Sequence, residues 1–194
     1  MYKVIFKRIF DLVVSLIFFL LISPLLVLVI LLILLFEKET PFFFQYRLGK
    51  HGKKFKLYKF RTMLNKKRDV TREILSGDSE VTTIGSYLRR YKIDELPQII
   101  NVIKGDMSIV GPRPCMVNQL VDFNEDGKQR LKVKPGLTGL AQINGNIYLS
   151  WEERWKYDRE YVENLSFLLD LKIFFKTILI VVYGEDKFIN KPNV

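Results

Sequence analysis

Cysteine and histidine are almost absent from the chain, which has one of each among its 194 residues, Cys115 and His51. A single cysteine rules out a disulfide within the chain and fits a reducing compartment. No His and Cys cluster has the spacing of zinc ligands, and neither common type of Gly-rich phosphate-binding loop is present. His51 lies in a basic turn with no partner nearby, which argues against a Ser-His-Asp triad.

Charge is missing from residues 12–36, a run of 25 residues whose only polar positions are Ser15 and Ser23. A helix needs about 20 apolar residues to cross a bilayer, so the run is long enough. At its centre, Pro24 follows Ser23. Proline lacks a backbone donor and crowds the preceding turn, so we expect the helix to kink or reverse there.

Three arrangements of this run are open from physics alone: an ordinary span with a tolerated proline, a re-entrant or interfacial hairpin, and a buried core helix. Both flanks are basic, with Lys3, Lys7 and Arg8 before the run and ten Lys or Arg without an acid over residues 47–68. A re-entrant helix keeps both flanks on the cytoplasmic side, where positive charge is favoured. No small-residue cleavage site follows, as a secretory signal would need. Either of the first two arrangements makes the chain a membrane protein.

The remaining residues, 37–194, are enough for one compact domain. The formal net charge is +10 and the isoelectric point is about 9.6. Such a domain attracts anionic lipid, phosphorylated ligands or nucleic acid, and charge alone does not choose among them. Many of the basic residues follow the apolar run directly, where lipid already accounts for them, so we expect membrane lipids and no nucleic acid as partner.

Pattern predicts an α+β fold, mainly helical. Aromatic residues at 42–47 and alternating residues at 55–60 flank a Gly-containing turn at 49–52, which predicts a β-hairpin. The segments with helical spacing or helix-start signals are residues 84–91, 94–104, 151–164 and 167–183. The last of these is strongly apolar with a polar edge, as in an amphipathic helix lying in the plane of the membrane interface.

The adjacent carboxylates Asp94 and Glu95 are the most informative pair outside the apolar run. Two carboxylates near a helix start can hold a divalent cation or supply a nucleophile. The alternative is a helix cap beside an exposed salt bridge. The basic residues in stiff or regular segments are Lys59, Arg61, Arg89, Arg90 and Arg113. Together they suit recognition of a diphosphate, and Mg²⁺ held by a carboxylate and phosphate oxygens would complete such a site.

Six motifs in order carry a family resemblance. They are Lys-Phe-Arg-Thr-Met at 59–63, Leu-Arg-Arg at 88–90, Ile-Asp-Glu-Leu-Pro-Gln at 93–98, Asn-Val-Ile-Lys-Gly-Asp-Met-Ser at 101–108, Val-Gly-Pro-Arg-Pro at 110–114 and Lys-Pro-Gly-Leu-Thr-Gly at 134–139. Over essentially its whole length the chain closely resembles the bacterial sugar transferases. These are the monotopic phosphoglycosyl transferases that begin glycoconjugate and polysaccharide assembly.

The resemblance implies transfer of a sugar 1-phosphate from a UDP-sugar to undecaprenyl phosphate. It assigns Asp94 as the nucleophile of a covalent sugar-phospho-aspartyl intermediate and Glu95 as a magnesium ligand or base, with both carboxylates as candidate ligands of Mg²⁺. Lys59, Arg89 and Arg113 match phosphate-binding positions. The family's membrane helix is re-entrant, which implies residues 1–36 as a re-entrant helix broken at Ser23-Pro24. Residues 37–194 would then form a catalytic domain on the cytoplasmic face of the bacterial inner membrane.

Three further residues are weaker candidates for substrate binding: Arg61, Arg90 and Asp158, the last because it matches the family's downstream pattern. Close relatives that act on acetamido sugars often have Gly-Arg-Asn where this chain has Gly145-Asn146-Ile147. The sequence therefore leaves the transferred sugar open, along with the polymer initiated and the oligomeric state, a homo-oligomer included. The rival hypothesis is a membrane-anchored basic protein without enzymatic activity that binds anionic lipid or nucleic acid.

Overall fold

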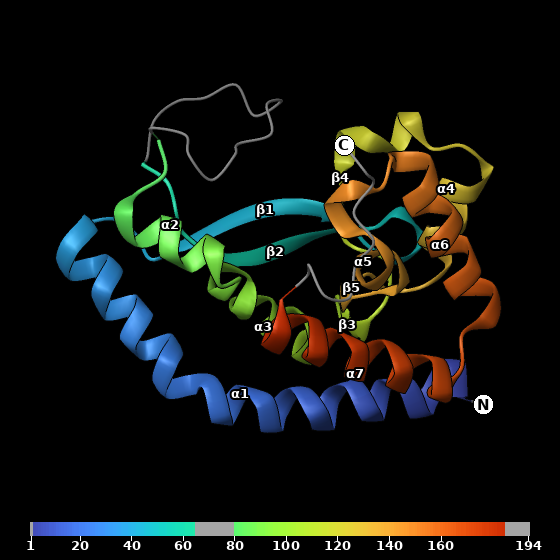
Figure 1. Ribbon diagram of the computed structural model, residues 1–194, viewed down its shortest axis with the longest axis horizontal. Coiled ribbons are helices and arrows are strands. Elements are labelled where there is room, and N and C mark those ends of the chain that lie inside the picture. The colour runs from blue at the N-terminus through green and yellow to red at the C-terminus, as the bar shows by residue number, and fades with distance from the viewer. Residues whose placement is uncertain (1, 65–79, 185–194) are drawn as a thin grey trace.

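The computed structural model describes residues 2–64 and 80–184 of the chain, and Figure 1 shows their arrangement. The helices are α1 (Lys7–Leu32), α2 (Thr83–Arg90), α3 (Ile99–Lys104), α4 (Glu125–Gln129), α5 (Leu140–Asn144), α6 (Trp151–Asn164) and α7 (Phe167–Tyr183). The strands are β1 (Phe42–Leu48), β2 (Lys54–Phe60), β3 (Ser108–Val110), β4 (Cys115–Met116) and β5 (Gly136–Thr138). The mainly helical α+β class is confirmed.

The predicted hairpin is confirmed as β1 and β2, which pair antiparallel from Phe42 with Phe60 to Leu48 with Lys54. Strand β4 adds to the other edge of β1, giving the order β2-β1-β4. A second, two-stranded parallel sheet joins β3 to β5. Figure 1 shows the hairpin as a long arm that reaches from the globular part of the molecule toward the far end of α1.

Helix α1 runs through Pro24 without interruption, so the expected break is a bend inside one continuous helix. Pro24 has no N–H to donate to the carbonyl of Leu20 one turn earlier. The hydroxyl of Ser23 donates to that carbonyl instead, at 2.9 Å. Figure 1 shows the helix lying along the lower side of the molecule and then turning upward. The adjacent Ser and Pro therefore bend the helix while replacing the lost hydrogen bond.

By length and composition, the continuous helical stretch Lys7–Glu37 is the one candidate for a membrane span in the described part of the chain. Only 17% of its most apolar window is buried within the molecule. A core helix would be mostly covered, so this exposure favours a helix that contacts lipid. Whether it re-enters or crosses the bilayer remains a prediction.

A buried carboxylate, Asp170 of α7, anchors the N-terminal half of α1. Its side chain is fully buried and pairs with Lys7 at 2.7 Å. The hydroxyls of Tyr2 and Tyr161 donate to it at 2.5 and 2.7 Å. One carboxylate thus joins the start of α1 to α6 and α7, and its charge is both paired and hydrogen-bonded, as a buried charge requires.

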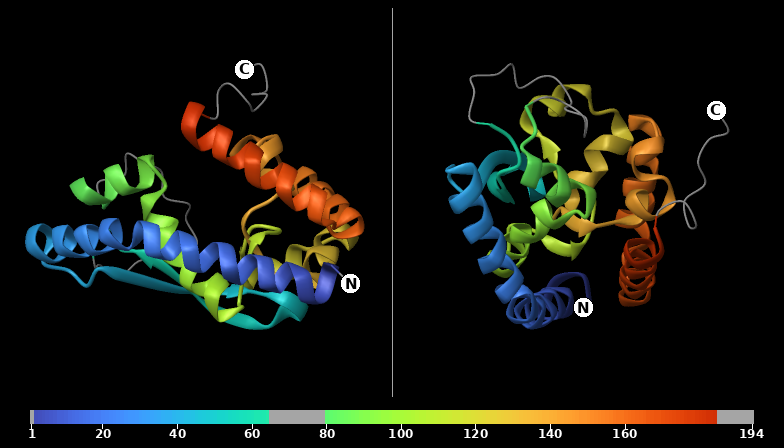
Figure 2. Two further views of the ribbon diagram at one scale, coloured as in Figure 1. Left: turned by 90° about the horizontal axis from the view of Figure 1, so that it is seen from below. Right: turned by 60° about the vertical axis from the view of Figure 1, so that its left-hand side comes forward.

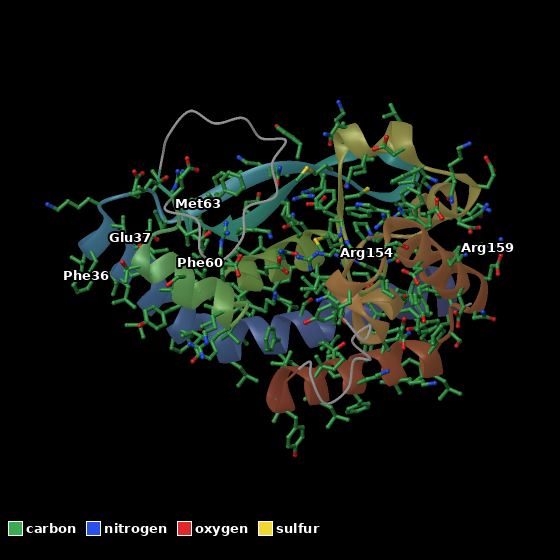
Figure 3. The ribbon with its side chains drawn as sticks, turned by 45° about the horizontal axis from the view of Figure 1, so that its top comes forward. Phe36, Glu37, Phe60, Met63, Arg154 and Arg159 are labelled. Atoms are coloured by element: carbon green, nitrogen blue, oxygen red, sulfur yellow. The ribbon has the colours of Figure 1, made fainter. Side chains whose placement is uncertain are left out.

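A second carboxylate on α1 attaches the helix to the small sheet. Asp11, only 2% exposed, accepts hydrogen bonds from the Ser108 hydroxyl at 2.8 Å and from the Ile109 N–H at 3.1 Å. Val29, near the end of α1, and Ile33, just after it, pack with Phe60 of the hairpin. Figure 2 shows α1 running alongside the hairpin arm, and in Figure 3 Phe60 lies at this end of the molecule. The apolar helix is therefore fixed to the fold at both of its ends.

We predict that Asp170→Asn destabilises the protein by about 3 kcal/mol, because it leaves the buried ammonium of Lys7 without its counter-charge. Asp126→Asn is the matched control, since Asp126 pairs at 3.0 Å with Arg159, whose side chain is half exposed. Exposed pairs contribute about 0–1 kcal/mol. Thermal unfolding in detergent measures both, and equal midpoints for the two variants would contradict the anchoring role of Asp170.

Candidate active site

A short 3-10 turn, Ile93–Gln98, presents the Asp94-Glu95 dyad. Helix α2 ends at Arg90, and two residues later Lys92 adopts the left-handed conformation with φ of 56° and redirects the chain. A helix was expected over residues 94–104; its first part is the 3-10 turn, which contains Pro97 and continues directly into α3. The reversal at Lys92 places both carboxylates in the first turn after it.

Glu95 is held by two cations that come from distant parts of the sequence. Lys59 of β2 contacts its Oε1 at 2.7 Å, and Arg113 contacts both oxygens, at 2.5 and 3.2 Å. Burial opposes ionisation of Glu95, but the charges and hydrogen bonds of Arg113 and Lys59 outweigh it and hold its pKa well below the usual range. Glu95 is therefore a carboxylate at neutral pH, and it joins β2 to the loop that follows β3.

Asp94 has a different environment from its neighbour. It is 9% exposed, and burial raises its pKa above the ordinary value, with the charge of Glu95 acting in the same direction. The charges of Lys59 and, less strongly, of Arg89 and Lys92 oppose that shift. No residue in the described part of the chain hydrogen-bonds the Asp94 carboxylate. Its oxygens are thus available to a substrate atom or a cation.

The other predicted cations are placed less uniformly. Arg89 lies near Asp94, and its Nε donates to the Thr62 hydroxyl at 2.9 Å. Arg61 donates to the Thr40 carbonyl at 2.9 Å, and Arg90 is exposed, with its guanidinium 5.7 Å from the Tyr91 ring centre. Neither Arg61 nor Arg90 forms an ion pair with the dyad. The structure therefore brings Lys59, Arg89 and Arg113 to the dyad. Arg61 and Arg90 instead contact the Thr40 carbonyl and the Tyr91 ring.

A cavity of about 430 Å³ opens beside Glu95 and Arg113. Its acidic lining residues are Glu95 and Asp158, and its basic ones are Arg47, Lys92, Arg113, Arg130 and Arg154. The excess of positive charge suits a ligand with several phosphate charges. Sequence reasoning did not single out Arg47, Arg130 or Arg154. Arg47 belongs to the basic run at 47–68, so the sequence did indicate a cationic role for it. Arg130 and Arg154 lie outside this run and outside the six motifs.

Asp158, predicted as a substrate-binding candidate, lines this cavity but is paired with a protein residue. Its Oδ2 lies 3.3 Å from Nη2 of Arg130, and both side chains are buried. The same Nη2 donates to the carbonyl of Arg113 at 2.5 Å. Asp158 and Arg130 therefore support the backbone of the residue whose guanidinium holds Glu95.

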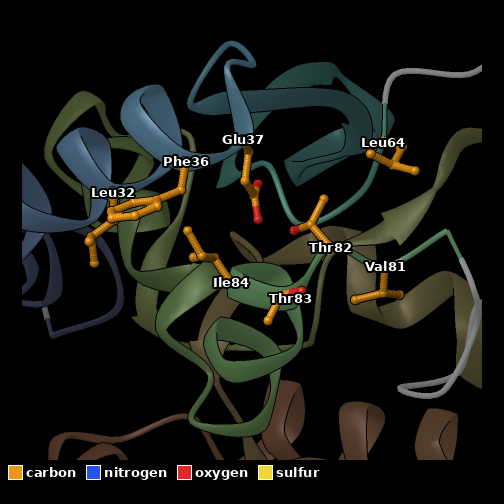
Figure 4. Close-up of a pocket in the computed structure, with 8 residues that line it drawn as sticks. All are labelled: Leu32, Phe36, Glu37, Leu64, Val81, Thr82, Thr83 and Ile84. Carbon is orange, nitrogen blue, oxygen red and sulfur yellow. The ribbon is translucent and has the colours of Figure 1, made fainter.

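A second cavity, of about 660 Å³, lies at the end of α1, away from the dyad (Figure 4). It is lined mainly by apolar and threonine side chains of the α1 end and the α2 start, with the carboxylate of Glu37 directed inward. None of the predicted site residues lines it. The smaller, basic cavity is therefore the candidate active site.

The Asp94-Glu95 dyad could hold a metal ion only together with the phosphate oxygens of a bound substrate. In residues 2–64 and 80–184, no group of three or more Asp, Glu, His or Cys could hold a metal ion. Glu95 already accepts from two cations, which leaves Asp94 as the more available carboxylate. Mg²⁺ usually takes one or two carboxylates together with phosphate oxygens and water. The dyad fits that mode, and a metal site made of protein alone is not present in these residues.

Asp94 has little solvent exposure, and its neighbour Glu95 lines the cationic cavity, which Asp94 itself does not line. An unpaired carboxylate beside a cationic cavity, in a molecule with an exposed apolar helix, is the arrangement of a group-transfer enzyme acting at a membrane. The chain belongs to the bacterial sugar transferase family, whose model matches residues 2–184. It is 44% identical over 182 residues to the uncharacterized sugar transferase EpsL of Bacillus subtilis, covering 93% of this chain and 89% of that one.

Two further relatives have names that state a reaction. The undecaprenyl-phosphate galactose phosphotransferase of Salmonella typhimurium is 34% identical over 203 residues, 94% of this chain and 41% of the relative. The UDP-glucose:undecaprenyl-phosphate glucose-1-phosphate transferase of Klebsiella pneumoniae is 39% identical over 185 residues, 91% of this chain and 40% of the relative. In both cases this chain corresponds to less than half of a longer protein.

Asp158 supplies a prediction about pH. Burial raises its pKa to about 6 from the ordinary 3.8, against the opposing charges of Arg130 and Arg154. The folded state therefore binds this proton more tightly than the unfolded state, so the contribution of Asp158 to stability falls as pH rises from about 4 to 6. Asp158→Asn cannot titrate. The difference in unfolding free energy between wild type and variant should decrease by about 3 kcal/mol across that interval.

Denaturant unfolding in detergent at a series of pH values measures this difference, and other titrating groups cancel in it. The difference should be constant above pH 7. A flat difference from pH 4 to 7 would show that Arg130 fully compensates the burial of Asp158.

Proposed function

We propose that the protein transfers a sugar 1-phosphate from a UDP-sugar to undecaprenyl phosphate, as the first membrane step of polysaccharide or glycoconjugate assembly. The observation that carries the proposal is the environment of the Asp94 carboxylate. Asp94 has little solvent exposure and no hydrogen-bond partner among the described residues. The neighbouring Glu95 is bound by a lysine and an arginine, the residue types that bind phosphate. The two relatives with named reactions support the same general chemistry.

In the proposed mechanism Asp94 attacks the phosphorus that carries the sugar. A bond forms between an aspartyl oxygen and this phosphorus, the bond to the bridging oxygen breaks, and UMP leaves with that oxygen. An oxygen of undecaprenyl phosphate then attacks the same phosphorus and releases the Asp94 carboxylate. The products are undecaprenyl diphosphate sugar and UMP. Two in-line steps at one phosphorus avoid bringing both substrates to the site at once.

The cations have a defined purpose in this mechanism. A carboxylate can attack a diphosphate only if the negative charge of the diphosphate is neutralised. Lys59, Arg89 and Arg113 lie around the dyad to do so. Mg²⁺, held by Asp94 or Glu95 together with substrate phosphate oxygens, would supply further electrostatic stabilisation. Asp94 is 9% exposed, which limits the access of water to an acyl-phosphate intermediate.

The proposed setting is the cytoplasmic face of the bacterial inner membrane. The exposed apolar α1 would enter the bilayer, bend at Ser23-Pro24 and leave by the same face. Helix α7, with Leu168, Val181 and Val182 largely exposed, would lie at the same interface. A water-soluble donor and a lipid acceptor could then reach one site without either leaving its own phase.

The first test is the intact mass of the purified protein after incubation with Mg²⁺ and a panel of UDP-sugars in the absence of lipid acceptor. We expect an increase of one sugar phosphate with the correct donor. Asp94→Asn should show no adduct and should lose at least a thousandfold in turnover, because an amide cannot attack phosphorus. Asp126→Asn, remote from the dyad, is the control and should keep both.

Normal turnover by Asp94→Asn would refute the proposed nucleophile. Insensitivity to changes at both Asp94 and Glu95, with binding to anionic lipid or nucleic acid that weakens steeply with salt, would favour the non-enzymatic rival. Removal of Mg²⁺ with a chelator should abolish adduct formation, and an undiminished adduct would exclude the metal from the first step.

The second test concerns the path of α1. Single cysteines at Lys3 and at Glu39 flank the helix, and the native Cys115 is only 4% exposed, so its background labelling should be slow. In sealed vesicles of known orientation, a re-entrant helix makes both new thiols reactive from the cytoplasmic side alone. Reaction of one thiol from each side would establish a crossing helix.

A further inference from the structure

Arg47 lines the active-site cavity and has no carboxylate partner in the described part of the chain. Its Nη2 donates to Oε1 of Gln45 at 2.8 Å, and its Nη1 lies 3.5 Å from the carbonyl oxygen of Pro114, which lines the same cavity. A guanidinium has five N–H donors, and these contacts occupy only two of them. Nε is buried, so the donors still available are on the two Nη atoms. Because the side chain is only half-buried, a ligand in the cavity can reach them.

Two other arginines of the cavity each have a carboxylate partner. Arg113 is bound to Glu95 at 2.5 Å, and Arg130 lies 3.3 Å from Asp158. Burial lowers the pKa of Arg47, the charge of Arg113 acts in the same direction, and nearby negative groups offset this only in part. A half-buried cation beside a second cation is unfavourable unless an anion joins it. An anionic ligand in the cavity would supply the missing counter-charge.

The hairpin places Arg47 and Lys59 on the same face of the sheet. Lys59 of β2 is paired with Phe43 of β1, and side chains at alternate positions of a strand share a face. Arg47 lies four residues beyond Phe43, about 13 Å along the strand at the usual rise per residue. Strand β1 is the central strand of its sheet, so the backbone of Arg47 is fixed relative to Lys59.

The contacts between these two cations define a row of charges. Lys59 contacts Glu95, Glu95 contacts Arg113, and the charge of Arg113 acts on Arg47. Asp94 belongs to the Lys59 end, because the charge of Lys59 is the strongest of those that oppose the rise in its pKa. Arg47 lines the cavity, whereas Asp94 does not. Arg47 therefore lies across the Glu95-Arg113 pair from Asp94.

We propose that Arg47 binds the phosphate group that lies opposite Asp94 during the reaction: the phosphate of UMP in the first step and the phosphate of the lipid acceptor in the second. The inference rests on the proposed function and deepens it. Phosphoryl transfer places the attacking and leaving oxygens in line. When Asp94 attacks, the nucleotide phosphate lies on the far side of the reacting phosphorus, where Arg47 is. When Asp94 becomes the leaving group, the lipid phosphate enters from that same side.

The guanidinium of Arg47 would stabilise the charge that moves in each step. As the bond from the reacting phosphorus to the bridging oxygen breaks, its electron pair stays on UMP, whose phosphate gains negative charge. Arg47 keeps its proton and donates to these oxygens, as arginine does with phosphates. Lys59 and Arg113 remain beside the phosphate that carries the sugar. In the second step the same guanidinium would hold the lipid phosphate while its oxygen attacks.

Equilibrium binding of UMP and of uridine to the full-length protein in detergent tests this contact without turnover. Arg47→Gln should weaken the binding of UMP at least tenfold, because charge-assisted hydrogen bonds to the phosphate are lost. Uridine lacks the phosphate, so its affinity should not change. Arg159→Gln removes the same charge from α6 outside the cavity and is the matched control, with wild-type affinity for both ligands.

Intact mass then separates the two steps of the reaction. Arg47→Gln should form the sugar-phosphate adduct at least tenfold more slowly than wild type at a subsaturating concentration of donor. Once the adduct has formed and the donor has been removed, its discharge by UMP and by undecaprenyl phosphate should be slowed by similar factors, because both phosphates use one contact. Arg159→Gln should match wild type in all three rates.

Unchanged UMP binding by Arg47→Gln would overturn the proposal. Equal weakening of UMP and uridine would also overturn it, by assigning Arg47 a structural role. Slow discharge by UMP together with normal discharge by undecaprenyl phosphate would refute the shared phosphate position.

If Arg47→Gln does not fold, as judged by its thermal midpoint, Arg47→Lys replaces it. A single ammonium cannot reproduce the paired donors of a planar guanidinium, so UMP binding should still weaken while uridine binding stays the same. Failure of the proposed function would appear differently, as the absence of adduct and of turnover in wild type with every UDP-sugar. The comparison of UMP with uridine would still decide whether Arg47 binds phosphate.

Discussion

The buried carboxylate of Asp170 is the contact on which the architecture depends, because a single side chain joins the start of the apolar helix to both C-terminal helices. It binds Lys7 at the start of the apolar helix and Tyr161 of α6 from its own position on α7. A helix exposed to lipid gains little from packing apolar side chains against protein, since lipid solvates them equally well. A paired charge buried at its polar end gives it a fixed position, and the dyad and its cavity are then held at a constant distance from the apolar surface.

Two neighbouring carboxylates in one turn have opposite chemical character because of what surrounds each. Glu95 is kept ionised by Lys59 and Arg113, whereas Asp94, one residue away, has no hydrogen-bond partner among the described residues and a pKa raised by burial. The difference depends on tertiary structure, since Lys59 and Arg113 come from a strand and a loop on either side of the dyad in sequence. It also separates their roles: Glu95 organises the cations, and Asp94 remains available to react.

Much of this molecule could be predicted from local pattern. The alternation at 55–60 and the Gly-containing turn predicted the hairpin, and helical spacing predicted α6 and α7, whose observed bounds, Trp151–Asn164 and Phe167–Tyr183, agree with the prediction. The bend at Pro24 was foreseen, but not that the Ser23 hydroxyl would keep the helix continuous. The helix expected over 94–104 begins as a 3-10 turn containing Pro97, because proline fits a 3-10 turn as well as the first turn of an α-helix.

The site was only partly predictable, for a physical reason. The dyad and three of its cations lie in recognisable motifs, whereas Arg130 and Arg154 become notable only through their places in the cavity and through partners distant in sequence.

The ion pairs of Glu95 with Lys59 and Arg113 affect how an anion binds in the active site. Lys59, Arg113 and Glu95 together carry a net charge of +1, so a phosphate that binds these two cations must displace or share the carboxylate already bound to them. Glu95 therefore competes with incoming anions for Lys59 and Arg113. A weak anion with one charge gains little by replacing the carboxylate. A diphosphate has more charge and two phosphate groups, so it replaces the carboxylate more favourably.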